Sequence, residues 1–373
     1  MKFSGLQENL KEGLNMVSHI AGKSVNLPIL NNVLIEVCDS SINLISTDLE
    51  IGITNKIRGK IEIEGKYTVD AKIINDFINL LPNNKVDFEL QNDELKIKCD
   101  KHQTKIKGQN AEEYPLIPKI EKKNPIIISI EEFKKALSQV AFATSNSETR
   151  LELNGILFSF LENAIYLVAT DSYRLAERKI NIKNRDELEA PKQNIIIPAK
   201  TAQELIRILS SVKNTEGDVK MYVNDNQALF VCESTELFSR LIEGQFPDYK
   251  QIIPENHKTE VIINRKDLIR AAKIASLFSK TGVNDVSLEI PKGQNKMIVT
   301  SASGQSGEST TEIEASVNGD DNGVVLNFRY LIDGLNNINE EFLKIKVLDS
   351  SAPCVLRGEK DEQYTYVIMP IKQ

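Results

Sequence analysis

The chain repeats one pattern three times, at an interval that is too long for a solenoid repeat and suits a whole domain. Three helix-period segments, each entered from a β-type run, start near Ala71, Ala199 and Phe328 and follow one another at intervals of about 128 residues. A self-similar unit of that length can bury its own core. The spacing therefore predicts three domains that share one fold.

Each repeat shows the same order of predicted elements. A short strand and an amphipathic helix come first, with the helices predicted over 6–20, 131–143 and 265–278. Their apolar residues recur every three to four positions, as on one face of a helix. A hairpin-like pair of strands follows, and then the second helix of the repeat. This order predicts an α+β protein.

Composition agrees with a large globular protein. The 373 residues are 41% hydrophobic and 27% charged, which is more chain than one core usually serves. Proline and charge interrupt the strands near 121–125 and 253–258, so the domains are predicted over 1–124, 125–255 and 256–373. No apolar run approaches the roughly 20 residues of a membrane span, and the amino terminus lacks a signal-peptide core. We therefore expect a soluble, cytoplasmic protein.

Cysteine and histidine offer little chemistry. Four cysteines lie far apart in strand-like runs, at Cys38, Cys99, Cys232 and Cys354. A metal or redox site would need clustered partners, and the three histidines are scattered. We therefore expect buried, inert thiols, with no metal and no cofactor.

Motifs of catalysis are missing from the sequence: it has no Walker loop, no nucleophile elbow and no zinc-protease helix. One duplicated feature remains, because Thr47-Asp48 and Thr170-Asp171 occupy matching places after a strand. The two aspartates could be offered as general acid and base. A short polar side chain after a strand also hydrogen-bonds its own backbone in a turn, which is the interpretation we favour. No catalytic activity is expected.

Longer motifs name a family. They are LPILNNVLIEV (27–37), STDLEI (46–51), LNGILF (153–158), VATDSYRLA (168–176), GQFPDY (244–249) and YVIMPIK (366–372). In this order they closely resemble the bacterial DNA polymerase III beta subunit, the replicative sliding clamp. The resemblance extends from the first residues of the chain to the last.

The resemblance implies a ring. Members of that family are head-to-tail homodimers of three-domain protomers, which close around duplex DNA of any sequence. The resemblance thus implies the DNA-clamp fold, with outer sheets and with inner helices that line the hole. They have no catalytic activity and act as processivity factors, tethering the polymerase III alpha subunit, the clamp loader and other replication and repair proteins. The expected location is the cytoplasm, in association with the nucleoid. Two alternatives remain: an enzyme built on Asp48 and Asp171, and a peptide-binding scaffold that does not encircle DNA.

The net charge of the chain argues against tight DNA binding, because the sequence has 46 Lys and Arg against 53 Asp and Glu. A ring that holds DNA topologically needs only weak contact with phosphate, so local charge on the helices matters more. The alternative is an ordinary solvated helix face. The candidate DNA-binding residues are Lys23, Lys72, Lys200, Arg207, Arg270 and Lys273.

The most specific implication is a hydrophobic pocket that receives a short Leu/Phe-rich peptide. By match of position the resemblance assigns to it Leu153, Thr170, Tyr173, Arg174, Leu175, Pro247, Ile252, Asn327, Tyr330, Pro353, Val367, Met369, Pro370 and Ile371. An apolar terminus with methionine suits a site that accepts many partners, since methionine repacks readily. The alternative is that residues such as Val367 belong to the core of a final strand.

Two further expectations concern the dimer and departures from the family pattern. The apolar step Leu277-Phe278 is expected to face an edge of the first domain near Ile106; ordinary helix packing is the alternative. Some clamps carry an exposed aromatic pair that meets DNA, and this chain has Leu151 and Glu152 there, which puts that contact in doubt. Ser24 stands for an arginine and Tyr173 for a histidine of other members.

Overall fold

The repeated pattern of the sequence becomes a repeated order of helices and strands. The structure is a computed structural model, and it describes residues 1–22, 27–38, 40–118, 120–161, 164–184 and 194–372. The first repeat comprises β1 (Lys2–Leu6), α1 (Gln7–Val17), β2 (Asn32–Cys38), β3 (Ser41–Thr47), β4 (Ile51–Ile57), β5 (Gly59–Ile63), β6 (Gly65–Asp70), α2 (Ala71–Leu80), β7 (Lys85–Gln91), β8 (Glu94–Cys99) and β9 (His102–Gln109).

The other two repeats follow the same order. The second comprises β10 (Ile126–Ser129), α3 (Ile130–Ala141), β11 (Gly155–Leu161), β12 (Ala164–Thr170), β13 (Arg174–Asn181), β14 (Ile195–Pro198), α4 (Ala199–Ser211), β15 (Asp218–Val223), β16 (Gln227–Cys232) and β17 (Thr235–Arg240). The third comprises β18 (Thr259–Asn264), α5 (Arg265–Ser276), β19 (Asp285–Ile290), β20 (Lys296–Ser303), β21 (Gly307–Gly319), β22 (Asn322–Asn327), α6 (Phe328–Asn337), β23 (Phe342–Val347), β24 (Cys354–Gly358) and β25 (Tyr364–Ile368).

The helices begin where the sequence supplies a cap. The Asp70 side chain accepts a hydrogen bond from the third backbone N–H of α2, and Asn327 and Asn264 do the same in the first turns of α6 and α5. Such a side chain satisfies a donor that the helix itself leaves unpaired, so it fixes the start of the helix. The predicted helices are confirmed to within a few residues at each end.

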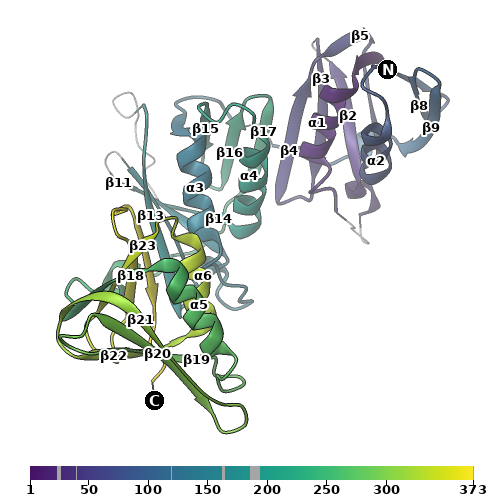
Figure 1. Ribbon diagram of the computed structural model, residues 1–373. Helices are drawn as coiled ribbons and strands as arrows, with labels where there is room; N and C mark the ends of the chain where they lie inside the picture. Colours follow the sequence, from purple (N-terminus) through teal and green to yellow (C-terminus); the bar gives the residue numbers. More distant parts are fainter. Residues whose placement is uncertain (23–26, 39, 119, 162–163, 185–193, 373) are drawn as a thin grey trace. The chain divides into compact units, whose positions relative to one another are not determined.

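By compactness the described chain forms two units. Unit 1 is made chiefly of residues 1–131 and 207–241, and unit 2 chiefly of residues 132–182 and 242–373. Unit 1 holds a 13-stranded sheet in the order β10-β15-β16-β17-β4-β3-β2-β6-β9-β8-β7-β1-β5. Unit 2 holds a 12-stranded sheet in the order β14-β11-β12-β13-β25-β24-β23-β18-β21-β20-β19-β22, on which α5 and α6 lie side by side (Figure 1).

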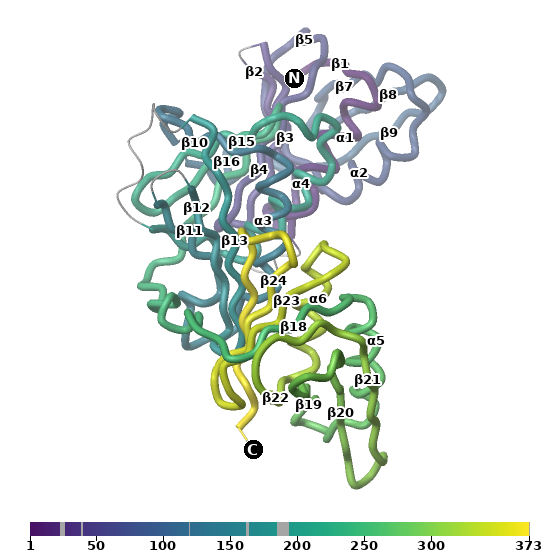
Figure 2. Tube along the Cα trace, turned by 60° about the vertical axis from the view of Figure 1, so that its left-hand side comes forward, coloured from purple at the N-terminus to yellow at the C-terminus, as the bar shows by residue number. Residues whose placement is uncertain are grey.

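Each sheet contains strands of two successive repeats, which pair with one another where the repeats meet. In unit 1, β4 of the first repeat pairs antiparallel with β17 of the second. In unit 2, β13 of the second repeat pairs antiparallel with β25 of the third, and Figure 2 shows this pairing as teal and yellow chain running alongside one another. We call each such pairing a junction. Because the second repeat gives strands to both sheets, compactness does not follow the predicted limits at 124 and 255, which stay a prediction.

Candidate functional site

Two matching turns lie at the ends of β3 and β12. In the second repeat the Thr170 hydroxyl donates to the carbonyl of Arg174 at 2.6 Å, and one Asp171 carboxylate oxygen accepts the N–H groups of Tyr173 and Arg174 at 3.0 Å. Thr47 and Asp48 make the corresponding contacts in the first repeat. The Thr47 hydroxyl donates to the carbonyl of Ile51, four residues on, and one Asp48 carboxylate oxygen accepts hydrogen bonds from the next backbone N–H groups of the turn. These hydrogen bonds confirm the turn interpretation, because each aspartate carboxylate binds backbone N–H groups of its own turn.

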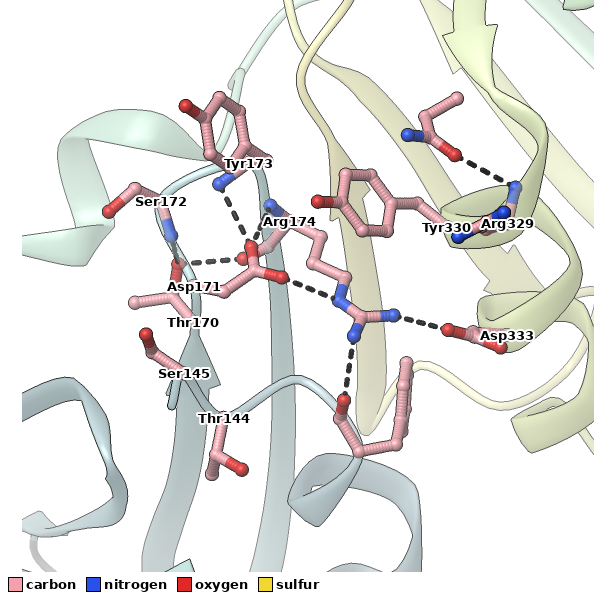
Figure 3. A network of polar contacts seen from close by, with 12 residues as sticks. Thr144, Ser145, Thr170, Asp171, Ser172, Tyr173, Arg174, Arg329, Tyr330 and Asp333 are labelled. Carbon is pink, nitrogen blue, oxygen red and sulfur yellow. Dashed lines mark hydrogen bonds and ion pairs between the residues drawn. The ribbon is translucent and has the colours of Figure 1, made fainter. Parts of the chain in front are cut away.

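Arg174 connects this turn to α6 (Figure 3). Its guanidinium donates to Asp171 at 2.9 Å, to Asp333 of α6 at 2.6 Å and to the carbonyl of Phe142 at 2.9 Å. The same group lies over the rings of Tyr330 at 4.7 Å and Phe142 at 5.3 Å. Each of the three guanidinium nitrogens thus donates a hydrogen bond, so the largely buried Arg174 side chain is held in one orientation.

An aromatic pair stands above the arginine. Tyr173 directly precedes β13, and its ring is stacked on that of Tyr330 of α6, with centroids 6.5 Å apart. Tyr173 is 63% exposed, whereas Tyr330 is partly covered. Figure 3 shows both rings on the same side of the Arg174 network. They provide an exposed apolar surface with hydroxyl groups at its edge.

The floor of the site is the β13–β25 junction. Leu175 lies opposite Val367, and each is 1% exposed, within a cluster that includes Val168, Tyr249 and Val355. Past the ladder, Met369 donates its N–H to the carbonyl of Tyr173 at 2.8 Å. The core alternative for Val367 therefore describes its burial correctly, and Val367 and Leu175 can offer a ligand only the top of a packed floor.

The remaining predicted residues lie around this floor to different degrees. Six of them are half-buried: Pro247, Ile252, Pro353, Met369, Pro370 and Ile371. Pro353 lines a cavity of about 360 Å³ beside Val355, whereas Pro247 lines a second one of about 480 Å³ beside Tyr249. Leu153 is buried and Asn327 caps α6. These two residues therefore contribute to the pocket indirectly, by fixing the elements in which they lie.

The corresponding junction of unit 1 is covered by the chain itself. Gly52 of β4 corresponds to Leu175, because each lies opposite the threonine of its turn in the ladder, and Gly52 pairs with Phe238 across the junction. The Cδ1 atom of Ile117 fills the space above it, only 2.7 Å from where a Cβ of residue 52 would be. Ile117 and Ile120 pack on the cluster around Phe238. At β13–β25 the partly buried Ile242, Phe246 and Ile253 pack on the corresponding cluster, so both junctions have a packed apolar floor. The cavities lined by Pro353 and Pro247 lie beside the floor of β13–β25.

The lysines and arginines predicted to contact DNA differ in their exposure and in their contacts within the protein. Lys72, Lys200, Arg270 and Lys273 are exposed on α2, α4 and α5, and Lys23 lies outside the described residues. Arg207 has a structural task, because its guanidinium donates to the last-turn carbonyls of Asn15 at 3.1 Å and Met16 at 2.6 Å. These carbonyls have no partner within α1, so Arg207 caps the end of that helix.

The predicted dimer residues differ as well. Leu277 is 72% exposed and Phe278 half-buried, as an interface would need, but Ile106 is buried in its own sheet. Ile106 alternates along β9 with exposed lysines, so its side chain points to the core. The sequence analysis missed a second apolar stripe on α2, where Ile73 and Leu80 are 56% and 85% exposed. The signal was present, since α2 is apolar on more than the face that carries Ile74 and Ile78.

The four cysteines differ in burial. Cys99, Cys232 and Cys354 are buried as expected, whereas Cys38 is partly exposed, contrary to expectation. Burial raises the pKa of Cys232 to about 11 and that of Cys354 to about 12, so both stay protonated near neutral pH. The described ranges contain no cluster of three potential metal ligands and no helix long and apolar enough to cross a membrane.

Family models match the chain from end to end. Residues 1–118 match the N-terminal domain of the DNA polymerase III beta subunit, residues 127–248 its central domain and residues 250–372 its C-terminal domain. The chain belongs to the DNA polymerase III beta subunit family. This family is that of the sliding clamp, a non-catalytic processivity subunit of DNA polymerase III, and the chain functions as such a clamp. The enzyme alternative has no support.

Relatives agree over the full length of the chain. The beta sliding clamp of Bacillus subtilis is 29% identical over 382 residues and covers 100% of both chains, and that of Staphylococcus aureus (strain Mu50) is 28% identical over 100% of this chain and 99% of its own. The crystal structure of the Bacillus subtilis clamp superimposes with a TM-score of 0.93 at 28% identity, covering 100% and 99%. The beta subunit of Thermotoga maritima gives 0.91 at 27% identity with the same coverage.

Proposed function

We propose that this clamp uses the β13–β25 junction as its peptide-binding pocket. One observation carries the proposal: cavities of about 360 and 480 Å³ lie beside the apolar cluster of this junction, and half-buried residues such as Met369 and Pro370 surround it. Polymerase, clamp loader and repair proteins would each insert a short Leu/Phe-rich segment there.

The pocket combines a rigid floor with an adaptable rim. Leu175 and Val367 support the inserted side chains from below, while Ile252, Met369 and Pro370 contact their sides. Burying two large apolar side chains contributes roughly 1.5 to 3 kcal/mol each before ordering costs. A micromolar dissociation constant, which is the affinity we expect of an isolated peptide, corresponds to about 8 kcal/mol, so the backbone and the neighbouring residues of the peptide must supply the rest.

The pocket is tested by removing its rim. Deleting residues 369–373 should abolish binding of a labelled Leu/Phe peptide in fluorescence anisotropy while the protein still runs as a dimer on a sizing column. Met369→Ser keeps the backbone hydrogen bond to Tyr173 and should weaken binding at least about fivefold, the loss of roughly 1 kcal/mol of apolar contact. Leu116→Ser alters an equally apolar, 93% exposed side chain in unit 1 and should change nothing. Unchanged binding after the deletion would refute the site.

We infer further that two protomers close head to tail. On α2, Ile73 and Leu80 are exposed and Phe77 between them is half-buried. Their counterparts 128 residues later on α4 are all buried, namely Thr201, Leu205 and Ile208. Leu277 follows the end of α5 and is equally exposed. An apolar stripe that is covered in one repeat and open in another suits a surface that a second copy covers. Head-to-tail contact through α2 and α5 would bury both stripes at once.

Duplex DNA would pass through the resulting ring in contact with phosphate alone. Replacing Lys72, Lys200, Arg270 and Lys273 with Ala should weaken retention equally on any DNA sequence. Each phosphate contact that is lost should flatten the slope of log affinity against log salt by about 0.9. The ring itself is tested by topology: the clamp should slide off linear DNA and stay on a circle of the same sequence. Equal retention on both would favour a scaffold that does not encircle DNA.

A clamp of this kind works where the chromosome is copied. The cytoplasm, in association with the nucleoid, is therefore the proposed location. A fluorescent fusion should form foci that coincide with newly synthesised DNA, and an even distribution during replication would contradict the proposal.

A further inference from the structure

The cavity of about 360 Å³ beside Val355 extends from the apolar floor to a charged part of the same sheet face. Pro353 directly precedes β24, and Val355 and Arg357 follow at every second position, so all three line the cavity from one face. Leu175, Val367 and Val355 form one row across β13, β25 and β24. Arg357 lies in the next row of this face, about 7 Å further along β24. The apolar floor therefore has a charged neighbour within reach of a bound peptide.

The guanidinium of Arg357 has no partner among the described residues. Its Nε atom is buried and makes no hydrogen bond, and the described ranges place no carboxylate within ion-pair distance of the group. Arg174 and Arg178 of β13, by contrast, each bind an aspartate. A polar group that leaves water without gaining a hydrogen bond costs free energy. Arg357 is thus prepared for an anion that comes from outside the protomer.

Positive charge gathers around Arg357. Lys344 of β23 lies directly opposite it, and Lys346 lies opposite Val355, one row closer to the floor. Lys346 binds Glu260 at 3.3 Å, whereas Lys344 has no ion pair in the described part of the chain. Like charges that lie opposite each other in a ladder repel. An anion bound at Arg357 would reduce this repulsion.

The carboxylates that line the cavity do not pair with Arg357. Glu177 lies in the same row but two strands away, with Thr365 of β25 between them, so the two backbones are about 10 Å apart. Its carboxylate lies near Tyr249 instead: burial and then this negative charge raise the pKa of the tyrosine hydroxyl. Glu255 lines the cavity as well and makes no ion pair within the described ranges. Space and charge at Arg357 therefore suit a carboxylate supplied by a ligand.

We propose that Arg357 binds an acidic side chain of the partner peptide, two residues away from the apolar pair that rests on the floor. This inference rests on the proposed peptide-binding pocket and specifies which peptides that pocket prefers. An extended peptide advances about 7 Å over two residues, which matches the step from the row of Val355 to that of Arg357. A carboxylate can accept two parallel hydrogen bonds from a guanidinium. Partners with Asp or Glu at this position would bind more tightly than partners with the apolar pair alone.

The contact is tested with pairs of labelled peptides and the full chain. One pair carries Glu or Gln two residues after a Leu-Phe step, and a second pair carries the same exchange two residues before it. In fluorescence anisotropy at low salt, the Glu peptide of one pair should bind about tenfold more tightly than its Gln counterpart. Arg357→Gln should remove this preference and leave the affinity for the Gln peptide unchanged within about twofold. Arg357→Glu should instead favour a peptide with Lys at that position.

A second measurement separates a binding role from a structural one. Because Arg357 has no partner to lose among the described residues, Arg357→Gln should keep the midpoint of thermal unfolding or raise it slightly. A clear fall in the midpoint together with the lost preference would show that Arg357 supports the sheet and affects the peptide only indirectly. That result would overturn the proposal.

Lys344→Gln is the matched control, because Lys344 lies opposite Arg357 but is not among the residues that line the cavity. It should keep most of the preference for the Glu peptide. An equal loss in Lys344→Gln and Arg357→Gln would overturn the direct contact in favour of general attraction by the positive row. Equal binding of the Glu and Gln peptides in both pairs would overturn the proposal and leave the pocket intact. If no Leu-Phe peptide bound the unaltered protein, the pocket and this contact would be contradicted together.

Discussion

Leu277→Asp is the change that should open the ring most directly. Leu277 is 72% exposed in the protomer, so covering it in a dimer would recover about two-thirds of the roughly 1.5 to 3 kcal/mol that full burial of a leucine contributes. Aspartate loses this contribution and must also shed water from a charge. We expect each of the two contacts between the protomers of a ring to lose about 3 kcal/mol of binding free energy. The dissociation constant of the dimer should therefore rise by roughly 10⁴-fold.

The assay is sedimentation velocity across a concentration series, which separates the 41.9 kDa protomer from a particle of twice that mass. Leu80→Asp, on the other side of the same proposed contact, should have a similar effect because Leu80 is 85% exposed. Leu116→Asp is the control, since Leu116 is 93% exposed and lies on neither stripe. If Leu277→Asp and Leu80→Asp dimerise as tightly as the Leu116→Asp control, the helix contact is wrong.

Two further predictions concern single contacts within the units. Arg207→Gln should lower the free energy of unfolding by about 1 to 2 kcal/mol by uncapping α1, and it should leave the salt dependence of DNA retention unchanged, whereas Lys200→Gln on the same helix should do the reverse. Asp361→Asn should cost about 2 to 3 kcal/mol, because it leaves the buried Arg178 without its carboxylate. Burial opposes ionisation of Asp361, but the Arg178 contact prevails and lowers its pKa. This contribution to stability is therefore complete above the unfolded pKa near 4 and lost as pH falls through the lower folded value, so denaturant titrations of the two proteins should converge in acid.

Local chemistry made much of the fold predictable. Asp70 and Asn327 mark helix starts, because a cap acts within one turn of chain, and the Thr-Asp turns likewise involve residues at most four positions apart. The site residues that came from resemblance could be placed on the β13–β25 junction for the same reason: they sit in contiguous motifs. Even the burial of Ile106 was open to prediction from its alternation with lysines along the strand.

Other features depend on pairings that no local pattern encodes. The β4–β17 ladder joins residues about 180 positions apart, and Arg207 reaches the carbonyls of Asn15 and Met16 across a similar separation. The packing of Ile117 over Gly52 is even harder to predict from the sequence, because it depends on the space that the absent side chain of a glycine leaves for a distant segment. Periodicity reports the faces of an element. It does not report which distant element will lie on them.

The two in-chain junctions suggest how one repeated fold serves different tasks. At β4–β17 the pairing carries apolar residues beneath Ile117, which excludes water and suits a permanent joint. At β13–β25 cavities lined by Pro353 and Pro247 lie beside the apolar cluster, and half-buried side chains such as Met369 surround it, which suits exchange of partners. The same strand pairing can therefore serve as a permanent joint in unit 1 and as the floor of the proposed binding pocket in unit 2.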